Sequence, residues 1–230
     1  MFTITPKVSG ENNKEYSYRV IKDGIMSLQL QPGQAISEIE LAEQLQISRT
    51  PIREVMAKLK EENLVEVLPQ VGTYIAKINF QLIEEATFMR YTLEKEVLKR
   101  SCQKFSSSAL VELKSIVLLQ ETLLDQKESE LDFHQLDTAF HLKIFQENNM
   151  EHVWGAITRL STHYNRMRVL SEMENSFATA IEQHKEIVRL IEEQAVDEVE
   201  NVIYQHIIEP KKVWEKLFNE EGPYQHYFDK

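Results

Sequence analysis

Residues 48–78 read SRTPIREVMAKLKEENLVEVLPQVGTYIAKI, a helix pattern that leads directly into a hairpin pattern. Ser48 is the expected N-cap of the helix, and Pro51 lies in its first turn, where a missing N–H costs no hydrogen bond. The apolar residues recur at the spacing of one helix face: Ile52, Val55, Met56 and Leu59. Alternating residues on either side of 69–72 then predict two short strands joined by a turn.

Two further helices are predicted upstream of this stretch. Apolar residues recur every three or four positions from Tyr18 to Leu28, and the Pro-Gly turn at 32–33 ends the pattern. Ser37, followed three residues later by Glu40, has the spacing of a capping box before a second short helix. Three helices followed by a hairpin predict a winged helix-turn-helix in residues 14–78, after a flexible tail in residues 1–13.

The start of the third helix carries residue types that contact DNA. In a helix-turn-helix the N-terminal residues of the last helix enter the major groove. Ser48 and Thr50 suit phosphate oxygens, while Arg49 and Arg53, four residues apart, suit guanine edges or phosphates. Gly72 would let the backbone of the wing approach DNA closely. The alternative is a three-helix packing module whose arginines are merely solvated.

Long helical patterns fill the rest of the chain, residues 79–230. The predicted segments are 80–104, 106–127, 131–149, 151–171, 175–193 and 196–217. Pro210 falls within the last segment and is expected to kink or shorten it. Because the connections are short, the segments predict an all-α antiparallel bundle. The predicted fold class is therefore mainly α, with an N-terminal winged helix-turn-helix followed by this bundle.

The composition limits the functions open to the chain. The net charge is −11, and nearly all of it lies in residues 79–230, so only the N-terminal third can carry a local basic face. The single cysteine, Cys102, excludes a disulfide within the chain. There is no secretory leader pattern, and no apolar run approaches the roughly 18 residues of a membrane span. These features predict a cytoplasmic protein without a membrane partner.

One cluster of residues in the bundle has the chemistry of a metal site. In HQLDTAFHLKIF, residues 134–145, Asp137 and His141 lie four apart on one helix face, beside apolar neighbours. His184 and His206 lie in two later helical segments, also among apolar residues. Three imidazoles and a carboxylate from three helices can enclose a divalent transition metal. The alternatives are surface or hydrogen-bonded core histidines, and His134 competes for the same face.

Residues 25–75, IMSLQLQPGQAISEIELAEQLQISRTPIREVMAKLKEENLVEVLPQVGTYI, resemble the winged helix of GntR-type bacterial transcription regulators. The resemblance implies that Arg49 and Arg53 contact DNA. Two positions depart from the family pattern. Ile39 stands where some members place a DNA-contacting arginine, and Val71 stands where a wing arginine often precedes the glycine.

The bundle is similar to the effector domain of the FCD subfamily of these regulators, through FMRYTLEKEVLKRS (88–101), the Asp-x-x-x-His block and EQHKEIVRLIEEQAVDEVENVIYQHI (182–207). The resemblance implies one metal-ligand set, namely Asp137, His141, His184 and His206. It also implies that Arg90 points into the same cavity, where a small organic acid binds. Asn165, Arg166 and Arg168 are weaker candidates for lining that cavity, the alternative being a solvated basic face.

Together these features predict a homodimeric, ligand-responsive transcriptional regulator, a repressor, that binds operator DNA. The predicted cofactor is a divalent transition metal, with zinc or nickel favoured by the histidine-rich ligand set. The predicted effector is a small carboxylate. The chain is not expected to be an enzyme. The alternatives are a metal-dependent hydrolase, or a regulator whose metal is purely structural.

Overall fold

The computed structural model describes residues 2–126, 129–214, 216–218 and 222–229. Its N-terminal part contains three helices and a small sheet: α1 (Asn13–Met26), β1 (Ala35–Ile36), α2 (Glu38–Gln44), α3 (Arg49–Glu61), β2 (Val65–Leu68) and β3 (Gly72–Ile75). The sheet is antiparallel, in the order β1-β3-β2, and β2 and β3 form the wing that follows α3. This arrangement confirms the predicted winged helix-turn-helix.

The apolar stripe of α3 packs on α1 and α2. Ile52, Val55 and Leu59 are fully buried, as are Ile21 and Ile25 of α1. Burying one such side chain contributes about 1.5–3 kcal/mol, so this small core holds the three helices together. Because the stripe occupies one face of α3, the opposite face, which carries the arginines, is left to solvent.

The structure differs from the sequence expectation at two places in this domain. Residues before α1 form no helix or strand but contact the domain, because Phe2 packs into the same core and Arg19 of α1 donates hydrogen bonds to Thr5 and Glu11. Asn12 caps α1 through a complete capping box. Ser48 precedes α3 but its side chain makes no cap hydrogen bond, so its hydroxyl is available to another partner.

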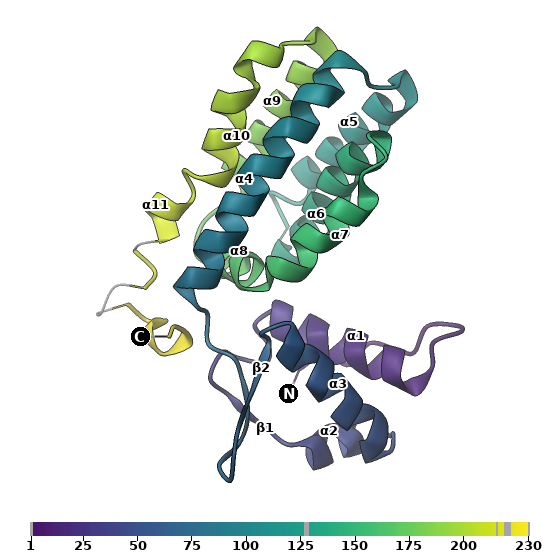
Figure 1. The fold of residues 1–230 in the computed structure, drawn as a ribbon, viewed down its shortest axis with the longest axis vertical. Coiled ribbons are helices and arrows are strands. Elements are labelled where there is room, and N and C mark those ends of the chain that lie inside the picture. Colours follow the sequence, from purple (N-terminus) through teal and green to yellow (C-terminus); the bar gives the residue numbers. More distant parts are fainter. Residues whose placement is uncertain (1, 127–128, 215, 219–221, 230) are drawn as a thin grey trace.

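The second part of the chain is a bundle of α-helices, which lies above the winged helix in Figure 1. Its elements are α4 (Phe80–Gln103), α5 (Ser107–Thr122), α6 (Glu130–Glu147), α7 (Glu151–Leu160), α8 (Thr162–Glu174), α9 (Ala178–Glu193), the 3₁₀ turn η1 (Val196–Glu198), α10 (Val199–Ile207), α11 (Lys211–Trp214) and the 3₁₀ turn η2 (Gln225–Tyr227). Helix α4 packs against five others, α6 to α10, and so forms the axis of the bundle.

Three predicted helices are shorter than expected. The segment predicted over 106–127 ends at Thr122, and residue 127 itself lies outside the described residues. The segment predicted as one helix over 151–171 is broken at Ser161 into α7 and α8, and the last segment ends at Ile207 instead of 217. Pro210 lies between α10 and α11, where its ring cannot continue a helix, so the expected shortening is confirmed. Within the described residues, no helix combines the length and the apolar character needed to cross a membrane.

Helix α8 and the end of the chain join the two parts. The Nε2–H of His163 donates to the carbonyl of Asn63 (2.8 Å), and the N–H of Asn79 donates to Nδ1 of His163 (3.0 Å). The Arg166 guanidinium donates to the carbonyl of Ala76 (2.6 Å). These bonds connect the bundle to the turn after α3 and to the segment that leaves the wing.

The C-terminal residues return to the same junction. Phe228 pairs with Ile78 in a short β-bridge, and the Ile78 N–H donates to the Tyr227 carbonyl (2.8 Å). Phe228 also stacks on Phe80, at the start of α4. The C-terminus therefore lies beside the segment that connects the wing to α4, as Figure 1 shows.

Candidate metal centre and nucleic-acid interface

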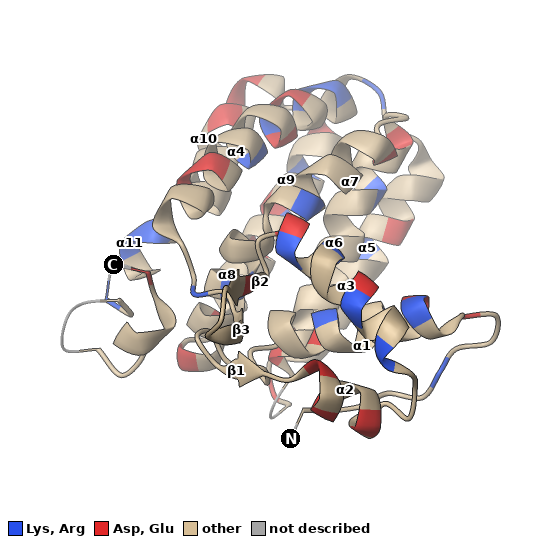
Figure 2. Cartoon of the chain, turned by 60° about the horizontal axis from the view of Figure 1, so that its bottom comes forward, with Lys and Arg blue, Asp and Glu red and all other residues tan. Residues whose placement is uncertain are grey.

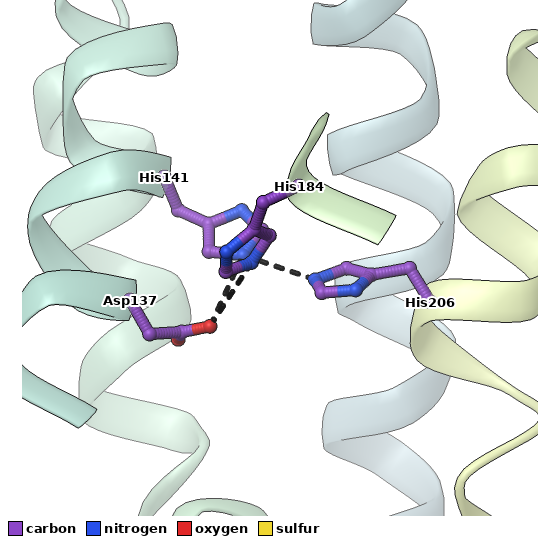
Figure 3. A group of neighbouring side chains, drawn as sticks. All are labelled: Asp137, His141, His184 and His206. Carbon is purple, nitrogen blue, oxygen red and sulfur yellow. Dashed lines mark hydrogen bonds and ion pairs between the residues drawn. The ribbon is translucent and has the colours of Figure 1, made fainter. Parts of the chain in front are cut away.

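Four side chains meet in the centre of the bundle. Asp137 and His141 project from α6, His184 from α9 and His206 from α10, and all four are buried. One potential ligand atom from each lies within 4.8 Å of the others. Figure 3 shows the three imidazoles and the carboxylate converging, with Asp137 and His141 on one helix and His184 and His206 on two others. The structure thus brings together the complete ligand set implied by the family resemblance.

His184 and His206 each donate a hydrogen bond through Nδ1, and His141 turns Nδ1 toward a carboxylate. His141 lies 2.9 Å from a carboxylate oxygen of Glu94, His184 lies 2.8 Å from Oε1 of Gln120, and His206 lies 3.0 Å from Oε1 of Gln183. An amide or carboxylate oxygen accepts only, so Nδ1 carries the proton in each ring. The Nε2 lone pairs of all three rings are therefore the ones free to ligate, as in known metal sites with a supporting outer shell.

The Nε2 atoms of the three histidines lie close together, and none of them carries a proton that it could donate to another. His141 Nε2 lies 3.1 Å from His206 Nε2, and His184 Nε2 lies 3.3 Å from Oδ1 of Asp137 without the geometry of a hydrogen bond. Burial lowers the pKa of His184 to about 4 and the pKa of His206 well below its usual range, so both rings are neutral near pH 7. Neutral nitrogen donors and one carboxylate fit a divalent transition metal.

Two arginines compensate the negative charges around this centre. Arg168 of α8 forms a bidentate pair with Asp137, at 2.7 and 2.9 Å. Burial raises the pKa of Asp137, but the Arg168 charge outweighs that effect and holds it well below the usual value. Arg90 of α4 donates to Glu94 at 2.6 Å. Burial likewise opposes ionisation of Glu94, but Arg90 and His141 hold its pKa at about 2.

Of the predicted effector residues, Arg90 and Asn165 line one small cavity. Its volume is about 10 Å³, and Asp137, Trp154 and Ser161 also line it. Nη2 of Arg90 is buried and has no hydrogen-bond partner among the described residues. The guanidinium also lies over the ring of Tyr164, 4.7 Å from its centroid. The cavity has room for about one water molecule, so a carboxylate reaches Arg90 there only if the walls move.

Arg168 borders a different and larger space. This cavity of about 400 Å³ lies beside α8, α9, α10 and α11, and His206 of the metal cluster also lines it. Arg166 lies elsewhere, because it faces the winged helix and not the effector region. Neither Arg166 nor Arg168 belongs to a solvated basic face, since both are at least 90% buried.

The predicted DNA-contacting residues form an exposed group at the start of α3. Ser48, Arg49, Thr50 and Arg53 are all exposed. Arg53 is held by an ion pair with Glu38 of α2 at 3.1 Å, and both side chains remain partly accessible. Figure 2 shows basic residues along α3 and acidic residues on α2. The basic face is thus local, as the charge distribution of the sequence predicts.

The wing offers backbone and apolar groups in place of basic side chains. Gly72 begins β3 opposite Leu68, with φ of 155°, a conformation that L side chains rarely adopt. Val71, which stands at the position of a common family arginine, is 67% exposed at the wing tip. Ile39, the other departure, is 45% exposed on α2. The exposed cations of this surface therefore belong to α3 and not to the wing.

Sequence reasoning missed the outer shell of the metal cluster. Glu94 lies within the stretch 88–101 that carries the FCD resemblance, but the sequence assigns it no role, and it assigns none to Gln120 or Gln183. Gln183 directly precedes His184 yet bonds His206, while Gln120 comes from α5. A buried polar position on an otherwise apolar helix face is the one local signal available for Gln120, which is fully buried.

Solved structures of other proteins share this architecture. E. coli McbR/YncC superimposes with a TM-score of 0.77 at 18% identity, covering 91% of this chain and 100% of that one. A putative GntR transcriptional regulator from Rhodococcus sp. RHA1 gives a TM-score of 0.72 at 16% identity, covering 88% and 97%. At these identities the likeness concerns the fold.

Sequence comparisons give the family. The HTH-type transcriptional repressor RspR of Escherichia coli K12 is 28% identical over 193 residues, 84% of each chain. A regulator from an unstable DNA locus of Streptomyces ambofaciens is 29% identical over 205 residues, 87% of this chain and 84% of that one. The family model of the bacterial gntR regulatory proteins matches residues 15–75, and that of the FCD domain matches residues 85–209. The chain therefore belongs to the GntR family of DNA-binding transcriptional regulators and carries an FCD domain as its ligand-binding part.

Proposed function

We propose that this regulator holds a divalent metal at Asp137, His141, His184 and His206 and uses the metal centre to sense a small carboxylate. The observation that carries the proposal is that all three rings turn Nδ1 toward an oxygen acceptor, His184 and His206 through hydrogen bonds and His141 at 2.9 Å from the Glu94 carboxylate. Three Nε2 atoms and a carboxylate oxygen are left close to one another. Zinc or nickel suits the ligand set. The metal would supply a coordination position for an anionic group. The family is one of transcriptional regulators and not an enzyme class.

The proposed DNA contacts come from the start of α3. Ser48 and Thr50 would bond phosphates, and Arg49 would read a base edge in the major groove. Arg53 would exchange its ion pair with Glu38 for a phosphate or a base. Gly72 would bring the wing backbone close to the adjacent backbone of the DNA. This assignment follows from exposure and from position on the motif.

The proposed assembly is a homodimer that binds a two-fold symmetric operator. Two-fold protein symmetry requires two half-sites, one for each α3. Helix α5 exposes three large apolar side chains, Val111, Leu118 and Leu119, with exposures of 63, 62 and 52%. An apolar face of this kind suits a protein partner, and we assign it to a second copy of the chain. The proposed action is repression, relieved or enforced by the effector.

Helix α8 is the proposed link between sensing and DNA binding. Its Arg168 donates hydrogen bonds to Asp137 of the metal cluster. Arg166, two residues earlier on the same helix, donates a hydrogen bond to the Ala76 carbonyl at the end of the wing. His163, on the same helix, holds the turn after α3. A ligand that changes the position of Arg168 would therefore shift the anchor of the winged helix. The coupling is a difference in ligand affinity between two arrangements of α8.

The test is selection of DNA by the full-length protein from a random duplex library, followed by titration of the selected site. A symmetric motif bound by wild type, and lost in Arg49→Ala, is the expected result. Zinc chelation should leave DNA binding measurable but abolish any response to carboxylates. The proposed DNA contacts would be overturned if wild type retained no duplex at any salt concentration. They would also be overturned if Arg49→Ala selected the same motif as strongly as wild type. A carboxylate response that survives chelation would show that the metal is only structural.

A further inference from the structure

The larger cavity beside the metal centre has one buried acidic group, Glu172, whose protein partner satisfies only one of its two oxygens. The cavity measures about 400 Å³, and Arg168 and Glu172 of α8 lie on its wall with His206 of α10. The Glu172 side chain is only 10% exposed. Its Oε1 lies 3.3 Å from the Arg168 guanidinium, while Oε2 is buried without a hydrogen-bond partner among the described residues.

Arg168 neutralises Glu172 only in part. Both terminal nitrogens of Arg168 already bond Asp137, at 2.7 and 2.9 Å, and that bidentate pair is the stronger interaction. Burial accordingly raises the pKa of Glu172 to about 7, against the lowering effect of Arg168. A carboxylate oxygen that is buried and unpaired costs free energy until a donor reaches it.

The remaining lining adds no cation. Glu209 is a second acidic residue of the wall, ion-paired at 2.7 Å with Lys212, which lies outside the lining; among the lining residues Arg168 is the sole arginine and there is no lysine. The polar side chains besides these are neutral, such as Gln183 and Asn175. The potential near Glu172 is therefore negative and favours a positively charged group.

The lining of the cavity combines two chemically different polar groups with apolar surface. His206 borders it as a member of the proposed metal cluster, and Glu172 borders it as the acid with an unpaired oxygen. Phe177, Val213 and Trp214 contribute apolar surface. This arrangement suits a ligand with an anionic end for the metal, a short hydrocarbon middle and a donor end for Glu172.

We propose that the effector is an aminocarboxylic acid, whose protonated amine binds Glu172 and whose carboxylate faces the metal centre at His206. The inference rests on the proposed metal-dependent sensing and narrows its ligand class. An ammonium group supplies charge-assisted hydrogen bonds to the unpaired oxygen, whereas a second carboxylate would meet Glu172 and Glu209 with like charge. A hydroxyl group would satisfy the same oxygen without the charge.

The test compares acids that differ only at the far end. Calorimetric titration of the zinc-loaded full-length protein at pH 7.5 would use γ-aminobutyrate, γ-hydroxybutyrate, butyrate and glutarate, with the set repeated at shorter and longer chain lengths. The expected result is that at one chain length the amine binds about tenfold to hundredfold more tightly than the methyl and carboxylate analogues. In Glu172→Gln this preference should disappear, whereas Glu182→Gln, an exposed control on α9, should keep it.

The outcomes separate the two levels of the proposal. Glutarate or butyrate binding as tightly as the amine at every length, unchanged in Glu172→Gln, would overturn the amine assignment and leave carboxylate sensing intact. Equal binding of the hydroxyl analogue would assign a neutral donor instead and would also overturn it. If none of the acids binds the zinc-loaded protein, both the amine assignment and the proposed sensing fail. The wild-type ligand series decides the matter even if Glu172→Gln does not fold.

Discussion

Nε2 of His141 and Nε2 of His206 face each other across 3.1 Å in the interior of the bundle. His206 donates through Nδ1 to Gln183, and His141 places Nδ1 2.9 Å from a carboxylate oxygen of Glu94, so both Nε2 atoms present lone pairs. Two lone pairs at this distance repel unless a proton or a cation lies between them or beside both. The arrangement is unfavourable in an apolar core and favourable around a metal ion, and it accounts for a buried polar cluster among aromatic side chains.

The first prediction concerns the amide that orients His184. Replacing Gln120 by Leu removes the acceptor 2.8 Å from His184 Nδ1, so the ring can rotate or change tautomer. Zinc affinity should fall by about tenfold to hundredfold, measured by competition with a fluorescent chelator. Gln103→Leu, an exposed change at the end of α4, is the control and should not alter the affinity. Unchanged zinc affinity in Gln120→Leu would mean that the outer shell does not support the site.

The second prediction concerns the start of α3. Arg49→Ala should weaken operator binding by about 1–3 kcal/mol, because a bidentate contact to a base is lost. Lys60→Ala, near the end of the same helix, should change the affinity little. Both can be measured by fluorescence anisotropy on the selected duplex at one fixed salt concentration. Equal losses in the two variants would indicate a diffuse electrostatic surface in place of a reading head.

The third prediction concerns the returning C-terminus. Phe228 is 4% exposed and packs on Phe80 beside the domain junction, whereas Phe88 of α4 is 74% exposed. Phe228→Ala should reduce the free energy of unfolding by about 3–5 kcal/mol, and Phe88→Ala should leave it within about 0.5 kcal/mol. Urea denaturation of both variants checks this. Similar stabilities for the two would show that the last residues do not hold the junction.

The fourth prediction concerns pH and the junction residue His163. Burial and the Arg166 charge lower the pKa of His163 from 6.5 to about 3, so the folded protein keeps it neutral. The unfolded chain binds a proton near pH 6.5, and the contribution of His163 is therefore present above that pH and is lost as the pH falls toward 3. Between pH 7 and pH 5 this loss amounts to about 2 kcal/mol.

His163→Gln isolates that contribution. In metal-free protein, stability should fall between pH 7 and pH 5 more steeply in wild type than in the variant, by about 2 kcal/mol. The other buried histidines titrate in both proteins and cancel in the difference. Parallel pH profiles of unfolding would contradict the assignment of a neutral His163 at the junction.

The local pattern of apolar residues and turn residues is sufficient to predict the winged helix. The stripe from Ile52 to Leu59, the proline in the first helical turn and the alternation around Gly72 are all short-range signals, and the structure confirms the elements that they predict. The pairing of Asp137 with His141 was also readable, because a spacing of four places two side chains on one helix face. His184 and His206 come from other helices; their apolar neighbours make them candidates, and the resemblance to the family implies that they complete the ligand set.

The features that the sequence does not predict share a physical cause: each depends on contact between segments that are distant in the chain. The break at Ser161 carries neither proline nor glycine, yet it separates α7 from α8, the helix whose Arg166 bonds Ala76 and whose Arg168 bonds Asp137. The return of Phe228 to Ile78 spans most of the bundle domain in sequence. Neither contact has a local periodicity, and both are set by tertiary packing.

The most direct test of the account is the metal content of the purified full-length protein, measured by plasma mass spectrometry after exchange into zinc-containing and then metal-free buffer. Wild type and His152→Ala, an exposed histidine variant of α7, should each retain about one equivalent of metal per chain. His184→Ala and His206→Ala should lose it. A metal-free wild type, or full retention in both cluster variants, would contradict the proposed metal centre.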